Sequence, residues 1–163
     1  MKTHHRHALI SIFTIVGLAA APTFAIAIEN AQQAIVTPAY EKNMRTMEMM
    51  NKLDANGDHT VSKAEGEAYF TKLFQTLDRN HDGVLDRTEW VGAAEEKEVI
   101  SLSTGGYARA LASMDMMVMV DTDGDHTVSK EEFIKAHEAL FNKMAGGQGV
   151  IDVQHWVSGH FPK

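Results

Sequence analysis

The chain has 163 residues, a formal net charge of -7 and no Cys. This length fits one compact domain or two small lobes, and the absence of Cys excludes a disulfide scaffold. With 44% hydrophobic and 23% charged residues, the composition is that of a globular protein. The excess of 22 Asp+Glu over 15 Lys+Arg argues against a nucleic-acid partner, because phosphate backbones are bound by basic patches.

The first segment has the features of a secretory signal peptide. Lys2 and Arg6 precede an uncharged run that ends near Pro22, and a small-residue tripeptide follows and ends at Ala27. A basic head, an apolar middle and a small-residue site predict cleavage after this alanine. Residues 1–27 would then be removed, and the protein would be periplasmic or secreted.

An uncleaved anchor is the alternative for this segment. Residues 8–28 form an uncharged stretch long enough to cross a bilayer, for which about 20 residues suffice. We favour cleavage because a proline interrupts the run, and cleavage would leave residues 28–163 as one domain without a stable membrane anchor. His4, His5 and His7 lie in the discarded segment, so we assign them no role.

Three twelve-residue windows share one spacing of oxygen-bearing side chains. They cover residues 54–65, 78–89 and 121–132, here named loops 1, 2 and 3. Each has oxygen donors at places 1, 3, 5, 9 and 12 and an apolar residue at place 8. A hard divalent cation prefers six to eight oxygens at about 2.3–2.6 Å, and a loop that curls around the ion brings alternate side chains inward. A single such window could be an acidic turn facing solvent, but three are hard to assign to chance.

These windows resemble the calcium loop of the EF-hand family in the calmodulin-like superfamily, and the chain resembles exported, bacterial-type EF-hand proteins. The resemblance implies an all-α fold of helix-loop-helix repeats, in two duplicated pairs with very short strand pairing between loops. It also implies three bound calcium ions, with the backbone carbonyl of place 7 and both carboxylate oxygens of place 12 as ligands. The implied metal ligands are Asp54, Asn56, Asp58, Thr60, Ser62, Glu65, Asp78, Asn80, Asp82, Val84, Asp86, Glu89, Asp121, Asp123, Asp125, Thr127, Ser129 and Glu132.

Half of the acidic residues of the chain, eleven of 22, stand at these ligand places. Unit charges a few Å apart repel appreciably even at an effective dielectric constant of about 20. Since calcium binds the native loops and scarcely the unfolded chain, we expect calcium to stabilise the fold.

The sequence contains an internal duplication. The hexapeptide 58–63 recurs letter for letter as 125–130, which indicates a duplicated pair of hands. The duplication predicts a fourth loop at residues 144–155, here named loop 4. Its places 1, 3, 5 and 12 carry no carboxylate, so we expect loop 4 to keep a structural role without holding calcium. His155 at its place 12 is expected to be an ordinary, partly buried histidine.

Short segments separate the loops of each pair. Only residues 66–77 lie between loops 1 and 2 and residues 133–143 between loops 3 and 4, whereas residues 90–120 lie between loops 2 and 3. Residues 63–77 carry apolar side chains at helical intervals. The segment either bends into two short turns or stays straight while the loops pair elsewhere. We favour the straight helix, and the pairing of the loops stays open. Residues 103–106 predict a break between two further helices.

Place 6 of such loops is usually Gly because the turn needs a positive φ. Loop 2 has Gly83 there, but loops 1 and 3 have His59 and His126. A residue other than Gly pays about 1–2 kcal/mol in left-handed geometry, so we expect weaker calcium binding at loops 1 and 3. We expect the two imidazole rings to face solvent; the alternative is that their protonation makes calcium affinity depend on pH.

Methionines gather in the segments before loops 1 and 3. We expect these side chains to pack in the core, and the alternative is a Met-rich groove that captures a protein partner. The methionines concerned are Met44, Met47, Met49, Met50, Met114, Met116, Met117 and Met119.

The leading functional hypothesis is therefore an exported calcium-binding protein that acts as a buffer or sensor. The alternative is a calcium-stabilised structural or adhesive module at the cell surface. We do not expect an enzyme, because the sequence has no Cys nucleophile, no Gly-rich phosphate loop and no paired carboxylates outside the loops.

Overall fold

The computed structural model describes residues 35–158, so the predicted signal segment lies outside the described residues. The described part is mostly helical, as predicted, with two short antiparallel strand pairs. No helix between residues 35 and 158 has the length and apolar character needed to cross a bilayer. In chain order the elements are α2 (Pro38–Met44), α3 (Met47–Leu53), β1 (Thr60–Ser62), α4 (Lys63–Leu77), β2 (Val84–Leu85), α5 (Arg87–Gly92), α6 (Lys97–Leu102), α7 (Gly105–Leu111), α8 (Met114–Val120), β3 (Val128–Ser129), α9 (Lys130–Ala145), β4 (Val150–Asp152) and α10 (Val153–Ser158).

Hydroxyl and carboxylate side chains fix where many of these helices begin. Thr37 caps α2 and Thr104 caps α7, and each side chain accepts a hydrogen bond from the backbone N–H three residues later. Ser62, Asp86 and Ser129 cap α4, α5 and α9 in the same way. In these three helices a Glu at the third position also accepts from the N–H of the cap residue, which completes a capping box. Such a box satisfies two amides that a helix start otherwise leaves unpaired.

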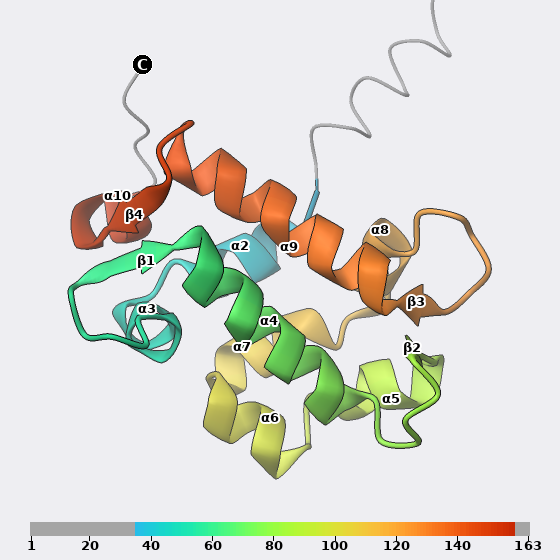
Figure 1. The fold of residues 1–163 in the computed structure, drawn as a ribbon. Helices are drawn as coiled ribbons and strands as arrows, with labels where there is room; N and C mark the ends of the chain where they lie inside the picture. Colours follow the sequence, from blue (N-terminus) through green and yellow to red (C-terminus); the bar gives the residue numbers. More distant parts are fainter. Residues whose placement is uncertain (1–34, 159–163) are drawn as a thin grey trace, which may run out of the picture.

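Helices α4 and α9 are each continuous, with 15 and 16 residues. This confirms the straight-helix prediction for residues 63–77. Phe70, Leu73, Phe74 and Leu77 form a buried stripe along α4, as the i, i+3, i+4, i+7 spacing of an amphipathic helix requires. Helices α4 and α9 lie side by side through the middle of the molecule (Figure 1). Helix α4 therefore connects loop 1 to loop 2, and α9 connects loop 3 to loop 4.

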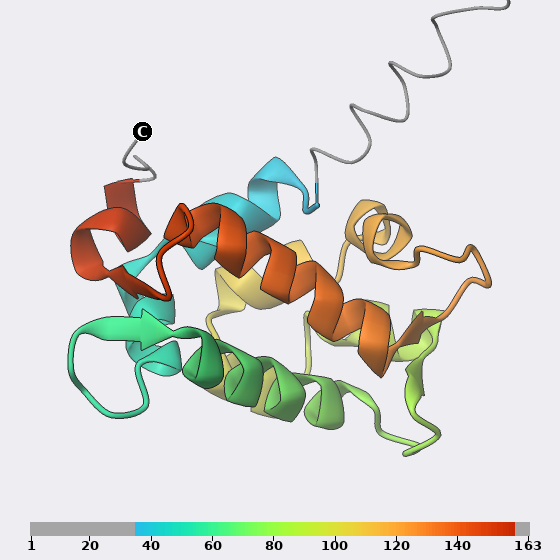
Figure 2. The same ribbon diagram turned by 45° about the horizontal axis from the view of Figure 1, so that its top comes forward.

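The strand pairs join loops from different halves of the chain. Strand β1 pairs with β4, where Val61 lies opposite Ile151, and β2 pairs with β3, where Leu85 lies opposite Val128. Fifteen residues of α4 span about 22 Å at 1.5 Å per residue, which keeps β1 and β2 apart. The two strand pairs consequently lie at opposite ends of the molecule (Figures 1 and 2). Loop 1 pairs with loop 4 and loop 2 with loop 3.

The duplication extends further towards the N-terminus than the loops alone indicate. Helices α2 and α3 recur as α7 and α8 at the offset of the repeated hexapeptide, and α5 recurs as α10, with α6 between the repeats. The two repeats also exchange equivalent hydrogen bonds. The indole Nε1 of Trp90 donates to the Ser113 carbonyl at 3.1 Å, and the indole Nε1 of Trp156 donates to the Thr46 carbonyl at 3.1 Å. Each repeat therefore needs the other to complete its core.

A hydrogen-bonded cluster lies where the two repeats meet. Tyr40 and Tyr107 are equivalent residues, both are fully buried, and their hydroxyls are hydrogen bonded to each other. The Tyr40 hydroxyl is also 2.5 Å from Nε2 of His137, whose Nδ1 is 2.6 Å from the Phe133 carbonyl oxygen. A carbonyl only accepts hydrogen bonds, so Nδ1 carries the proton and Nε2 accepts from Tyr40. The Tyr107 hydroxyl then donates to Tyr40, and every hydroxyl and ring nitrogen of this cluster has a hydrogen-bond partner.

This arrangement requires a neutral imidazole. His137 is 1% exposed, and its ring lies 4.0 Å from that of Phe70 and 4.2 Å from that of Phe133, measured between centroids. Burial lowers the pKa of His137 to about 4, because charged groups are poorly solvated in such surroundings. The neighbouring Phe70 occupies the equivalent position in the first repeat, so only the second repeat supplies a histidine to this cluster.

We predict that His137 makes the fold sensitive to acid. Its pKa in the folded state is depressed, so its contribution to stability is complete above about pH 6.5 and is lost as the pH falls to about 4, a loss of roughly 3 kcal/mol. His137→Phe copies the residue of the first repeat and should cost about 1 kcal/mol at neutral pH, because Tyr40 loses a hydrogen-bond partner. Urea unfolding at pH 7 and pH 4, with equal calcium, should show a smaller acid loss in the variant than in the parent. An equal loss in both proteins would contradict the assignment.

Candidate metal centres

Helix ends anchor each of the three candidate loops. Place 1 is the residue that ends the entering helix, namely Asp54 after α3, Asp78 after α4 and Asp121 after α8. Place 12 is the third residue of the exiting helix in each loop, where the glutamate belongs to the capping box; these residues are Glu65, Glu89 and Glu132. The first and last predicted ligands of each loop are thus positioned by local helix-terminus chemistry.

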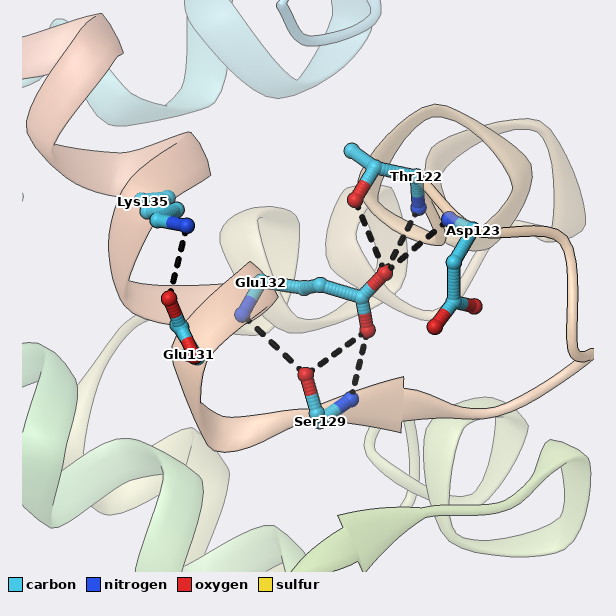
Figure 3. Close-up of polar contacts among 6 residues, drawn as sticks. All are labelled: Thr122, Asp123, Ser129, Glu131, Glu132 and Lys135. Carbon is cyan, nitrogen blue, oxygen red and sulfur yellow. Dashed lines mark hydrogen bonds and ion pairs between the residues drawn. The ribbon is translucent and has the colours of Figure 1, made fainter.

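Backbone amides of the loop hold the glutamate at place 12. In loop 3, Oε1 of Glu132 accepts from the N–H groups of Thr122 at 2.8 Å and Asp123 at 3.3 Å, and from the Thr122 hydroxyl at 2.9 Å. Its Oε2 accepts from the N–H and hydroxyl of Ser129 at 2.9 and 2.8 Å (Figure 3). The carboxylate therefore bridges the beginning and the end of the loop.

Loops 1 and 2 repeat this arrangement. Oε1 of Glu65 accepts from the N–H groups of Ala55 and Asn56 at 3.1 and 3.3 Å, and Oε2 accepts from the Ser62 N–H at 2.9 Å. In loop 2 the Glu89 carboxylate accepts from the backbone N–H groups of places 2, 3 and 9 at 2.9, 3.2 and 3.2 Å. Three loops of different sequence thus orient the glutamate at place 12 in the same way.

The side chains at places 1, 3 and 5 also accept backbone amides. Oδ2 of the place 1 Asp accepts from the place 6 N–H at 2.9 Å in loop 1, 3.1 Å in loop 2 and 3.0 Å in loop 3. The place 3 side chain accepts from the place 5 N–H at 2.8, 2.9 and 3.1 Å, and the place 5 Asp from the place 7 N–H at 2.8, 3.0 and 2.8 Å. These bonds turn the backbone of each loop around its side-chain oxygens.

Hydrogen bonds keep several of these carboxyl groups ionised at neutral pH. The N–H of Ser62 is the main cause of the lowered pKa of Glu65, and the Thr60 hydroxyl is the main cause of the lowered pKa of Asp58. Burial by itself raises the pKa of Glu132, but hydrogen bonds from Ser129 and Thr122 outweigh it and lower the pKa to about 2. The loops therefore present negative charge over the physiological pH range.

The donor atoms fit a hard divalent cation. Within residues 35–158, ligand oxygens of Asp121, Asp123 and Glu132 lie within 4.8 Å of one another, which makes them a group that could hold a metal ion. Loops 1 and 2 have the same backbone hydrogen bonds but an amide, Asn56 or Asn80, in place of the carboxylate at place 3. An all-oxygen donor set that ends in a Glu suits calcium better than zinc or copper, which prefer nitrogen and sulfur ligands.

Positive φ values occur at two places in each loop. At place 6 they are 64° for His59, 88° for Gly83 and 72° for His126, as expected for this place. At place 4 they are 74°, 59° and 76°, with His81 in loop 2 and Gly in the other loops. Each loop therefore has one His and one Gly in left-handed geometry, and this strain gives no reason to rank loops 1 and 3 below loop 2. The side chains of His59, His81 and His126 are exposed.

Loop 4 departs from the other three at its beginning. Its places 1 and 2, Met144 and Ala145, still belong to α9, and both are buried. Gly146 and Gly147 then turn the chain with φ values of 56° and 86°. The Asp152 carboxylate accepts from the backbone N–H of His155 at 2.9 Å and pairs with its Nδ1 at 2.8 Å. Loop 4 thus starts with a core methionine where the other loops have an Asp.

Most of the methionines before loops 1 and 3 are buried, which confirms that they belong to the core. The buried ones are Met44, Met49, Met50, Met116 and Met117. Met47, Met114 and Met119 are 43%, 37% and 38% exposed. No single face therefore presents all of these side chains to a partner.

The comparisons with known proteins agree with this geometry. Residues 67–137 match the family model of an EF-hand domain pair, and no curated protein matches the chain. The matched stretch begins in α4, contains loops 2 and 3 and ends in α9, so it covers the two loops whose strands β2 and β3 pair. This match supports an EF-hand calcium-binding family for the stretch that it covers, 71 of the 163 residues.

Proposed function

We propose that this chain is an exported calcium buffer that holds three calcium ions, in loops 1, 2 and 3, and is stabilised by them. The ligands would be the side-chain oxygens of places 1, 3, 5, 9 and 12 together with the backbone carbonyls of Thr60, Val84 and Thr127. Bound calcium supplies the positive charge that offsets repulsion among the carboxylates of each loop. EF-hand families are typically non-catalytic, which favours binding over catalysis.

We favour a buffer over a sensor because each long helix is shared by two hands. A sensor of the calmodulin type changes the angle between the two helices of a hand when calcium binds. Here α4 belongs to the hands of loops 1 and 2, and α9 to those of loops 3 and 4. If α4 swung away at one end, it would break its packing on α9 along its whole length. The bridging indoles of Trp90 and Trp156, both buried, oppose the same motion.

Export rests on the composition of the segment 1–27. Its basic head, uncharged run and small-residue site are typical of a signal peptide, and they direct the domain to a compartment outside the cytoplasm, the periplasm or the medium. Calcium sites of extracellular modules commonly have dissociation constants near 10⁻⁴–10⁻³ M, which suits a buffer in such a compartment.

The first prediction from this proposed function concerns the number of calcium sites. Titration calorimetry of the chain from Ile28 should give three calcium ions per molecule. Glu89→Gln and Glu132→Gln should each remove one, because the amide supplies a single neutral oxygen where calcium requires two charged ones. Asp152→Asn, in loop 4, is the matched control and should leave three. Binding of no calcium, or a loss of one site in the control, would contradict the assignment.

The second prediction separates buffer from sensor. At a calcium concentration a hundred times the dissociation constant, each filled site should add about 2.7 kcal/mol to the free energy of unfolding. The fluorescence of an apolar dye should stay flat over the same titration, because the core methionines remain covered. A dye signal that rises as the sites fill would instead indicate a sensor that opens.

The third prediction tests export. The chain expressed from Met1 should be recovered outside the cytoplasm with Ile28 as its N-terminal residue, as shown by N-terminal sequencing. Recovery in the membrane fraction with the segment 1–27 retained would favour the anchor.

A further inference from the structure

We propose that Asn56 is a site of spontaneous covalent modification, in which the backbone nitrogen of Gly57 attacks the side-chain amide and calcium binding in loop 1 slows the reaction. The effect of calcium rests on the proposed function, and the chemistry itself does not. Gly57 N forms a bond to Cγ of Asn56 and loses its proton, while the bond from Cγ to Nδ2 breaks and ammonia leaves. Water then opens the resulting cyclic imide at either carbonyl and gives aspartate or isoaspartate.

The nucleophile is unobstructed. Asn56-Gly57 is the single Asn-Gly dipeptide of the sequence, and both residues are exposed. A Cβ built on Gly57 would meet nothing within 4 Å. Without a side chain the glycine nitrogen approaches the neighbouring carbonyl more freely than that of any other residue, and it turns at low cost through the backbone angles that ring closure needs.

Two hydrogen bonds in loop 1 prepare the reacting groups. The Gly57 N–H donates to Oδ1 of Asp54 at 2.8 Å, so a carboxylate stands at the proton that must be removed. The Asp58 N–H donates to Oδ1 of Asn56 at 2.8 Å, which is the oxygen on which negative charge grows as the bond forms. A fixed amide dipole at that oxygen stabilises such charge.

Loops 2 and 3 provide internal comparisons. In loop 2, Oδ1 of Asn80 accepts from the Asp82 N–H at 2.9 Å, but the next residue is His81, whose side chain hinders the attacking nitrogen. In loop 3 the Gly124 N–H donates to Asp121 at 2.7 Å, but the attacked group is a carboxylate, a poorer electrophile than an amide. Loop 1 combines the free nitrogen with the amide.

Calcium in loop 1 would engage the same atoms. Asp54 and the Asn56 oxygen are proposed ligands, so the bound ion would draw the carboxylate away from the Gly57 proton. It would also hold the Asn56 side chain in one orientation, whereas ring closure requires that side chain to move toward the Gly57 nitrogen. We therefore expect the reaction to proceed mainly when loop 1 holds no calcium.

The two products affect loop 1 in opposite ways. Aspartate gives loop 1 the order of residue types that loop 3 has at places 3 to 7 and adds a fourth carboxylate. Isoaspartate inserts an extra methylene into the backbone between places 3 and 4, which shifts every later donor relative to Asp54. One product strengthens the site and the other disrupts it.

The test is to age the purified chain from Ile28 in mildly alkaline buffer, with a chelator or with saturating calcium, and to follow each loop peptide by mass spectrometry. In chelator Asn56 should be modified at least about tenfold faster than Asn80, a difference in barrier of about 1.4 kcal/mol. Asp54→Asn should slow the reaction, and the matched change Asp121→Asn in loop 3 should not. Calcium should slow the reaction of the parent chain.

The outcomes distinguish this inference from the proposed function. If Asn56 and Asn80 react at the same rate in chelator, or Asp54→Asn reacts as fast as the parent, the inference fails while calorimetry still measures three sites. If Asn56 reacts fast but calcium has no effect, and calorimetry finds loop 1 without calcium, the site proposed for loop 1 fails while the chemistry stands. Calorimetry of Asn56→Asp should show three sites, with binding at loop 1 at least as tight as in the parent.

Discussion

A continuous helix between two loops is the constraint on which the rest of this structure depends. Helix α4 runs without a break from loop 1 to loop 2, so the short strands of these loops lie too far apart to pair. Each strand must find its partner in the other repeat, and β1–β4 and β2–β3 are the result. The indole bonds of Trp90 and Trp156 cross between repeats for the same reason. Two short repeats thereby become one domain with a common core.

This constraint explains why loop 4 is retained without a calcium-binding donor set. Strand β4 is the partner of β1, and Ile151 and Trp156 fill core positions at 1% exposure. Without loop 4, the strand of loop 1 would lose its ladder and α3 would lose its contact with α10. The residues at the ligand places of loop 4 could change freely, because loop 4 supports loop 1 through its packing and not through its charge. Met144 replaces the first ligand and adds to the core in doing so.

Local chemistry determined which features the sequence could predict. Ligand spacing, helix caps and apolar stripes are short-range patterns, so the three loops and the straight α4 follow from them. The pairing of the loops and the Tyr40–His137–Tyr107 cluster depend on contacts between distant parts of the chain, which no window analysis brings together. A signal was present, since Thr37 and Thr104 are caps at the same offset as the repeated hexapeptide. The left-handed conformation of His81 was not predicted, because the expected positive φ concerned place 6 alone.

The remaining differences among the loops are differences of charge. All three loops have a capping box and positive φ at places 4 and 6, and each loop has one His at positive φ. Loops 2 and 3 each have four carboxylates at ligand places, whereas loop 1 has three. Calcium affinity in such loops is tuned by ligand charge and by rigidity, and loops 2 and 3 also support each other through β2 and β3. Under the proposed function, loop 1 would therefore be the weaker site and would spend more time without calcium than its neighbours, and it is the loop that contains Asn56-Gly57.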